Sequence, residues 1–145
     1  MLYVITGPPA AGKSSWIEGH AKPEDIVIDL DRITVALTGP GAPHWNHGEV
    51  QQRVAQRARY AAIDEAIKHL DKVDVYLIHT MPKAKALAQY KRLGARIVPV
   101  DPGREVVMNR IKAMRSPAME RVATRWYNAR RRQAATGMPQ TSRRW

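Results

Sequence analysis

One short stretch near the amino end constrains this chain more than any other, the loop Gly7-Pro8-Pro9-Ala10-Ala11-Gly12-Lys13-Ser14. It matches the phosphate-loop pattern G-x-x-x-x-G-K-[ST]. An apolar, β-branched run at residues 2–6 precedes the loop, and residues 15–18 after it can continue as a helix. Because the pattern works between a strand and a helix, this context favours a true phosphate loop over a chance match in a Gly- and Pro-rich turn.

The residue types in this loop are those that bind the phosphates of a nucleotide. Backbone N–H groups of residues 11–14 would form an anion-binding concavity, and the helix that starts there adds partial positive charge. Lys13 would reach the outer phosphates, and the Ser14 hydroxyl would hold Mg²⁺, which takes few protein ligands. We therefore expect residues 7–15, Ser15 included, to bind ATP or GTP together with Mg²⁺.

The rest of the chain alternates short apolar runs with helical patterns. We expect strands at residues 2–6, 26–30, 73–80 and 97–100, the last at an edge of the sheet because it contains a proline. We expect helices directly after the loop and at residues 33–37, 49–70, 82–93, 103–114 and 119–135. Such alternation predicts an α/β fold with a parallel sheet and helices on both faces. Ligands then bind at the carboxyl ends of the strands.

Composition narrows the setting in which such a fold works. A length of 145 residues predicts one domain, at residues 1–136, with a loose basic tail at residues 137–145. The chain has no cysteine, which excludes disulfides and zinc–thiolate sites. No apolar run approaches the roughly 20 residues of a membrane span. Because the first expected strand begins almost at Met1, we expect no signal peptide. We expect a cytoplasmic protein without a membrane partner.

The charge predicts an anionic partner. The chain has 24 Lys and Arg against 13 Asp and Glu, a net charge of +11, and most of the excess follows residue 104. In the last helix one stripe is apolar, with Met119, Val122, Trp126 and Ala129, and is expected to be core. Arg121 and Arg125 belong to a second stripe, either a solvated face or a track for the phosphates of a nucleic acid.

Four segments together carry a resemblance to a known family: G-P-P-A-A-G-K-S-S-W, D-R-I-T-V-A-L-T-G, V-Y-L-I-H-T and D-P-G-R-E-V-V-M-N-R-I-K-A-M-R. From residue 2 to about residue 132 the chain resembles the small P-loop kinases, most closely the kinase domain of phage-type 5′-polynucleotide kinases. The resemblance implies the sheet order 2-3-1-4. It also implies a general base at Asp31, and a lid arginine against the transferring phosphoryl group at Arg115 or Arg110.

The position of Asp31 agrees with the role that the resemblance implies. It follows the second strand, where a carboxylate can face bound nucleotide and accept the proton of an acceptor hydroxyl. It can also cap the next helix. Two positions depart from the family pattern. Thr34 stands where the family has an arginine for the acceptor phosphate, although Arg32 is close by, and His79 stands where the family has an acidic residue.

A long loop at residues 38–48 carries His44, Trp45 and His47. These side chains allow three interpretations: a metal site, a surface on which a base stacks, or simple loop packing. The leading function is an ATP-dependent phosphotransferase that acts on a nucleic-acid 5′ end or a nucleotide, with Arg32 and Trp45 on the acceptor side. The alternatives are a small-molecule kinase and a nucleotide-dependent nucleic-acid-binding or regulatory module with weak or no kinase activity.

Overall fold

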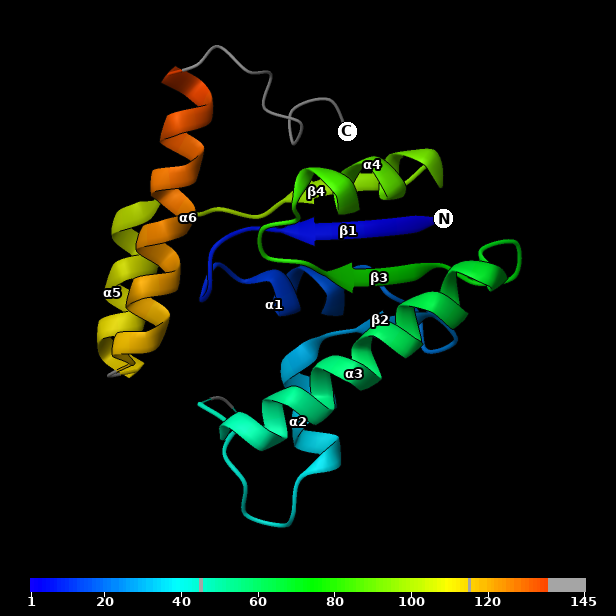
Figure 1. The fold of residues 1–145 in the computed structure, drawn as a ribbon, viewed down its shortest axis with the longest axis horizontal. Helices are drawn as coiled ribbons and strands as arrows, with labels where there is room; N and C mark the ends of the chain where they lie inside the picture. Colours follow the sequence, from blue (N-terminus) through cyan, green and yellow to red (C-terminus); the bar gives the residue numbers. More distant parts are fainter. Residues whose placement is uncertain (45, 115, 136–145) are drawn as a thin grey trace.

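Four strands of the described residues form an all-parallel sheet in the order β2-β3-β1-β4 (Figure 1). The computed structural model describes residues 1–44, 46–114 and 116–135. The strands are β1 (Leu2–Thr6), β2 (Ile26–Ile28), β3 (Val75–Ile78) and β4 (Arg96–Pro99). The α/β class and the strand order are therefore confirmed, and β4 with its proline lies at an edge, as expected. The expected tail at residues 137–145 lies outside the described residues.

Helices cover both faces of this sheet and its carboxyl edge. They are α1 (Lys13–Glu18), α2 (Leu30–Leu37), α3 (Glu49–Ala66), α4 (Ala84–Arg92), α5 (Arg104–Met114) and α6 (Pro117–Ala135), with a 3-10 turn, η1 (Ile67–His69), after α3. The helices α3 and α4 pack on one face and α1 on the other. Figure 1 shows α5 and α6 beyond the arrowheads of β1 and β3, where the strands end.

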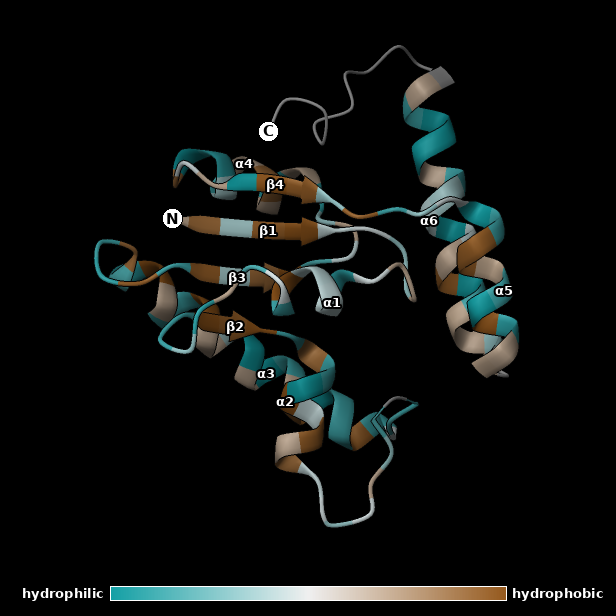
Figure 2. Cartoon of the chain, turned by 180° about the vertical axis from the view of Figure 1, so that it is seen from behind, coloured by the Kyte–Doolittle hydropathy of each residue, from teal (hydrophilic) through white to brown (hydrophobic). Residues whose placement is uncertain are grey.

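The alternation of side chains along the strands divides the interior into two layers. Leu2 and Val4 of β1 point into the layer beneath α3 and α4, whereas Ile5 packs with Ile17 of α1 on the opposite face. Figure 2 shows the strands as the most continuously hydrophobic elements. Each buried aliphatic side chain contributes about 1.5–3 kcal/mol to stability, so the sheet is a firm base for the loops at its carboxyl edge.

The junction between β2 and α2 differs from the expectation. The last residue pair of β2 with β3 joins Ile28 to Leu77, and Asp29 is the N-cap of α2, with an extended backbone at φ −131° and ψ 117°. The Asp29 side chain accepts a hydrogen bond from the backbone N–H of Asp31 at 3.1 Å. The expectation that Asp31 caps the helix was therefore wrong. The strand releases the chain two residues earlier, which places Asp31 in the first turn of α2.

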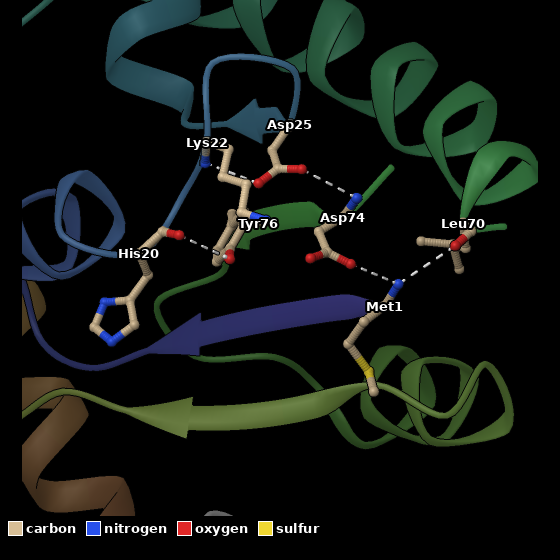
Figure 3. A network of polar contacts seen from close by, with 7 residues as sticks. All are labelled: Met1, His20, Lys22, Asp25, Leu70, Asp74 and Tyr76. Carbon is tan, nitrogen blue, oxygen red and sulfur yellow. Dashed lines mark hydrogen bonds and ion pairs between the residues drawn. The ribbon is translucent and has the colours of Figure 1, made fainter. Parts of the chain in front are cut away.

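A polar network ties the amino ends of the strands together, at the edge of the sheet opposite the loop (Figure 3). The Met1 amino group forms an ion pair with Asp74 at 3.0 Å, just before β3. The Asp25 carboxylate accepts hydrogen bonds from the backbone N–H groups of Lys22 and Asp74, at 2.8 and 3.3 Å. These contacts hold β1, β2 and β3 in register at the end away from the candidate site.

The helix α6 begins two residues before its expected start, at Pro117, and the Ser116 hydroxyl accepts a hydrogen bond from the Met119 N–H at 3.3 Å. Its buried side is set by Ala123 and Trp126, whereas Val122 is 36% exposed, so the expected apolar stripe was wrong at Val122. The contact with α5 rotates the helix toward Ala123. None of the helices in the described ranges is long and apolar enough to cross a membrane.

Candidate functional site

The residues 7–14, here called the glycine loop, join β1 to α1 at the carboxyl edge of the sheet. The Gly7 N–H donates to the carbonyl of Thr80 at 3.2 Å, which ties the loop to the end of β3. Gly7 has φ +142°, and a Cβ there would lie 3.1 Å from the Val100 carbonyl carbon and overlap its oxygen. Ala10 and Gly12 have φ values of +62° and +99°, so the loop takes a conformation that favours glycine.

Lys13 folds over the glycine loop rather than toward solvent. Its Nζ donates to the carbonyl oxygens of Gly7 at 2.9 Å and Pro8 at 2.6 Å. Burial lowers the pKa of Lys13 to about 8, while the negative charges of Asp29 and Asp31 act in the opposite direction. The lysine is therefore a cation held at the loop by neutral carbonyl groups. A negatively charged phosphate oxygen can replace these carbonyl groups as a stronger hydrogen-bond acceptor.

Ser14 and Asp29 form a direct pair at the start of α1. The Ser14 hydroxyl donates to Asp29 Oδ2 at 3.1 Å, and the other Asp29 oxygen binds the backbone of α2. Asp29 is only 7% exposed, whereas Ser14 and Ser15 are exposed. Sequence reasoning missed Asp29. The signal was present in D-L-D, because either aspartate can cap the following helix, and only the end of β2 decides between them.

Asp31 is the more exposed of the two aspartates at the start of α2, Asp29 and Asp31. Its side chain is 63% exposed, and its Oδ1 lies 3.8 Å from Nε2 of His47, a side chain that is 5% exposed. The largest cause of the raised pKa of Asp31 is loss of hydration of its carboxylate to the surrounding protein. The negative charge of Asp29 raises this pKa further, whereas His47 and Lys13 lower it. A carboxylate with a raised pKa at this edge is a better proton acceptor than an ordinary surface aspartate.

The pair α5 and α6 closes over the glycine loop from the side. Ala11 packs against Val107, Ile111 and Ala123. Arg110 donates from its NH1 to the carbonyl of Ala10 at 3.0 Å, so one of the two expected lid arginines reaches the loop. The other, Arg115, lies outside the described residues.

Hydrogen bonds from two aromatic side chains connect α6 to the carboxyl edge of the sheet. Trp126 of α6 donates from Nε1 to the carbonyl of Thr80 at 3.0 Å, the same oxygen that accepts from Gly7. The Tyr127 hydroxyl donates to Asp101 Oδ1 at 2.7 Å, which links α6 to the loop after β4. Both bonds fix α6 relative to the carboxyl edge, so any cation carried by α5 is held in place as well.

The two positions that depart from the family pattern have structural partners. Thr34 is 1% exposed, and its hydroxyl donates to the carbonyl of Leu30 at 2.7 Å. His79 Nδ1 lies 2.9 Å from the Tyr90 hydroxyl, and burial, with the charge of Arg59, lowers the pKa of His79 to about 4. His79 also lines a cavity of about 350 Å³ between α3 and α4. The imidazole is therefore neutral near pH 7.

The expected acceptor-side residues lie in different places. Arg32 is exposed on α2, Arg121 and Arg125 are exposed on α6, and Trp45 lies outside the described residues. In the loop at residues 38–48, His44 is exposed, whereas His47 is turned inward toward Asp31. Among the described residues there is no group of three or more His, Cys, Asp or Glu side chains that could hold a metal.

The Ser14 hydroxyl and the Asp29 carboxylate are oxygen groups of the kind that Mg²⁺ takes as ligands. A hydroxyl held by a buried carboxylate is the kind of oxygen that Mg²⁺ accepts, with water and phosphate oxygens as its other ligands. Comparison of the sequence with protein-family models gives no match, and comparison with curated proteins gives none either. The geometry of this edge and the resemblance of its motifs are therefore the observations that bear on function.

Proposed function

We propose that this protein is an ATP-dependent phosphotransferase that acts on a hydroxyl group of a nucleic-acid 5′ end or a nucleotide, with GTP as the alternative donor. The observation that supports the proposal best is that two carboxylates beside the glycine loop differ in burial and in hydrogen-bond partners. Asp29 is buried and occupied by Ser14 and the backbone of α2. Asp31 is open to solvent and has a raised pKa.

The roles of the loop residues follow from their positions. Lys13 would exchange its bonds to the Gly7 and Pro8 carbonyls for bonds to the outer phosphates of the nucleotide. Ser14 would hold Mg²⁺, which neutralises negative charge on the phosphates when bound. Asp29 keeps the Ser14 hydroxyl oriented. Arg110, already at the Ala10 carbonyl, would add a second cation beside the phosphoryl group that moves.

The chemistry at the acceptor is a proton transfer coupled to displacement at phosphorus. The acceptor oxygen bonds to the γ-phosphorus, the bond to the bridging oxygen breaks, and the nucleoside diphosphate leaves. Asp31 takes the proton of the acceptor hydroxyl as this bond forms. Because Asp31 is the more exposed carboxylate at this edge, an acceptor can reach it from solvent without displacing Asp29.

A second candidate is a nucleotide-dependent nucleic-acid-binding or regulatory module with little transfer activity. Two observations favour it. Thr34 is buried and bonded within α2, so it offers nothing to an acceptor phosphate. His79, with its lowered pKa, is neutral where the family has a carboxylate. The exposed arginines of α6 would then be the main binding surface.

The deciding experiment offers labelled ATP to three acceptors side by side: a 5′-hydroxyl oligonucleotide, a nucleoside and water. Label on the oligonucleotide or the nucleoside supports the phosphotransferase. Label only in free phosphate, or none at all, supports the binding module. In a separate reaction a small alcohol is added as a fourth acceptor. Label on this alcohol, with none on the oligonucleotide or the nucleoside, points to the small-molecule kinase.

Two variants test the assigned residues in this assay. Lys13→Ala should weaken nucleotide binding or abolish transfer, and Asp31→Asn should lower transfer by about 10²–10⁴-fold while leaving nucleotide binding intact. The matched controls are Lys72→Ala and Asp71→Asn, both exposed in the turn before β3 at the opposite edge of the sheet. Normal transfer by either active-edge variant, with both variants folded, contradicts the site assignment.

A further inference from the structure

One side chain beside the proposed site has no role in the scheme above. His47 comes from the loop between α2 and α3, its side chain is 5% exposed, and its Nε2 has no hydrogen-bond partner among the described residues. Buried polar atoms in folded proteins are nearly always paired, so an unpaired one calls for an explanation. The nearest charged partner of this nitrogen is Oδ1 of Asp31, at 3.8 Å.

The position of His47 is set by the helix that follows it. The Gln52 side-chain amide of α3 donates to the His47 carbonyl at 2.7 Å, and the Gln52 backbone N–H donates to the carbonyl of Gly48 at 2.9 Å. Asn46, directly before His47, has φ +60°, a left-handed turn that asparagine tolerates well. The backbone of His47 is therefore anchored to the first turn of α3.

The partner carboxylate is anchored to a second helix that packs on the first. Asp31 lies in the first turn of α2, and its backbone N–H is held by the Asp29 cap. Because α2 and α3 pack against each other, the separation of His47 and Asp31 is a property of the helix pair. A distance of 3.8 Å is longer than a hydrogen bond, so a bond between the two side chains requires a movement of the exposed Asp31 carboxylate.

We propose that His47 is a positioning residue for Asp31, an inference that rests on the proposed phosphotransferase function. With the acceptor in place, the Nε2–H of His47 donates to Oδ1 of Asp31. This bond fixes the plane of the carboxylate and leaves Oδ2 directed at the acceptor hydroxyl. After transfer, the proton of the hydroxyl is on Oδ2 of Asp31, and the bond from His47 to Oδ1 is unchanged.

An imidazole at position 47 is compatible with the proposed role of Asp31 as a general base. The groups that act on Asp31 are Asp29 at the end of β2, Lys13 at the glycine loop and His47 from the loop before α3. A second lysine or arginine in place of His47 would stabilise the ionised carboxylate and weaken it as a base. An imidazole N–H at this position can orient the carboxylate through one hydrogen bond.

The test compares variants in the transfer assay, with whichever acceptor the wild-type protein labels. His47→Ala should lower kcat by about 10- to 100-fold, the size of effect that misplacement of a catalytic group produces, with an unchanged KM for ATP. His47→Gln can present an N–H near the position of Nε2 and should restore most of kcat. The control His44→Ala, an exposed histidine of the same loop, should match the wild type.

Two further measurements separate positioning from a purely structural role. In His47→Ala the acid limb of the kcat profile should move to higher pH, because His47 lowers the pKa of Asp31. In an Asp31→Asn background, His47→Ala should cause no further loss, since the two residues act as a unit. Equal losses in the Ala and Gln variants with a lower Tm, or a profile that does not move, overturn the positioning role.

The proposed function and this inference fail in different ways. If the wild type transfers phosphate and Asp31→Asn does not, but His47→Ala behaves like His44→Ala, the inference is wrong and the phosphotransferase stands. If the wild type transfers phosphate to no acceptor, both are wrong.

Discussion

Gly7 offers a direct test of how the glycine loop is built. Two separate features oppose any side chain there: the backbone has φ +142°, and a Cβ would overlap the carbonyl oxygen of Val100. The obstacle is main chain, and it cannot move freely, because the Val100 N–H donates to the Thr6 carbonyl at 2.8 Å. Moving Val100 would break the pairing of β1 with β4 next to the loop.

The expected cost can be divided between these two features with three variants. Gly7→Ala should destabilise the fold by about 3–5 kcal/mol, the sum of backbone strain and overpacking. Gly12 has φ +99°, but no atom lies within 4 Å of a Cβ placed there. Gly12→Ala should therefore cost only the backbone strain, about 1–2 kcal/mol. Gly39→Ala has neither feature and should change stability by less than about 1 kcal/mol, in either direction.

Urea unfolding, followed by tryptophan fluorescence and by circular dichroism, measures these differences. With an m-value of about 2 kcal/mol per molar, Gly7→Ala should lower the midpoint by about 2 M and Gly12→Ala by less than about 1 M. The m-value should stay constant across the series. If Gly7→Ala costs no more than Gly12→Ala, the close approach of Val100 does not limit this position, and the reasoning is refuted.

Two further predictions concern His79 and the arginines of α6. The pKa of His79 is lowered to about 4 in the folded protein, so between about pH 6.5 and 4 the unfolded chain binds a proton that the folded chain does not. Stability should therefore fall as the pH drops through this window, and His79→Gln should flatten the fall in Tm between about pH 7 and pH 4.5. Replacing both Arg121 and Arg125 by alanine should make binding to single-stranded DNA less sensitive to salt. The slope should fall by up to about 0.7 log units per log salt for each phosphate that these arginines neutralise.

Each of these predictions has a matched control. His44→Gln, an exposed histidine, should leave the pH dependence of Tm unchanged, and an unaltered profile in His79→Gln contradicts the lowered pKa. Replacing Lys22 and Lys72, both exposed at the opposite edge of the sheet, removes the same charge without touching α6. No binding of the wild type to oligonucleotide at low salt rules out the nucleic-acid surface.

Much of the fold was predictable, because its signals are local in the sequence. The glycine loop lies between an apolar run and a helical pattern, and alternating strands and helices restrict the sheet to parallel topologies. Parallel strands bring their carboxyl ends to one edge, so Lys13, Ser14 and Asp31 could be placed near each other from the order of the elements alone. The strand order came from the family resemblance, and the structure confirms it.

The division of roles within the site was not predictable, because it depends on where chain segments separate and which helices pack. Asp29 and Asp31 are equally good caps by residue type, and the end of the pairing between β2 and β3 selects Asp29. Exposure on α6 depends on its rotation against α5, which buries Ala123 and leaves Val122 outside.

His47 gives the sharpest contrast between sequence and structure. From its neighbours alone it is one histidine in a Gly- and Pro-rich loop, where packing, stacking and metal binding are all reasonable interpretations. In the structure its ring is buried and its Nε2 lies 3.8 Å from Oδ1 of Asp31, a residue well before it in the chain. Local sequence determines which segments become strands, helices and turns. Burial and the pairing of distant side chains are decided only when those segments pack, because both depend on surfaces supplied by other parts of the chain.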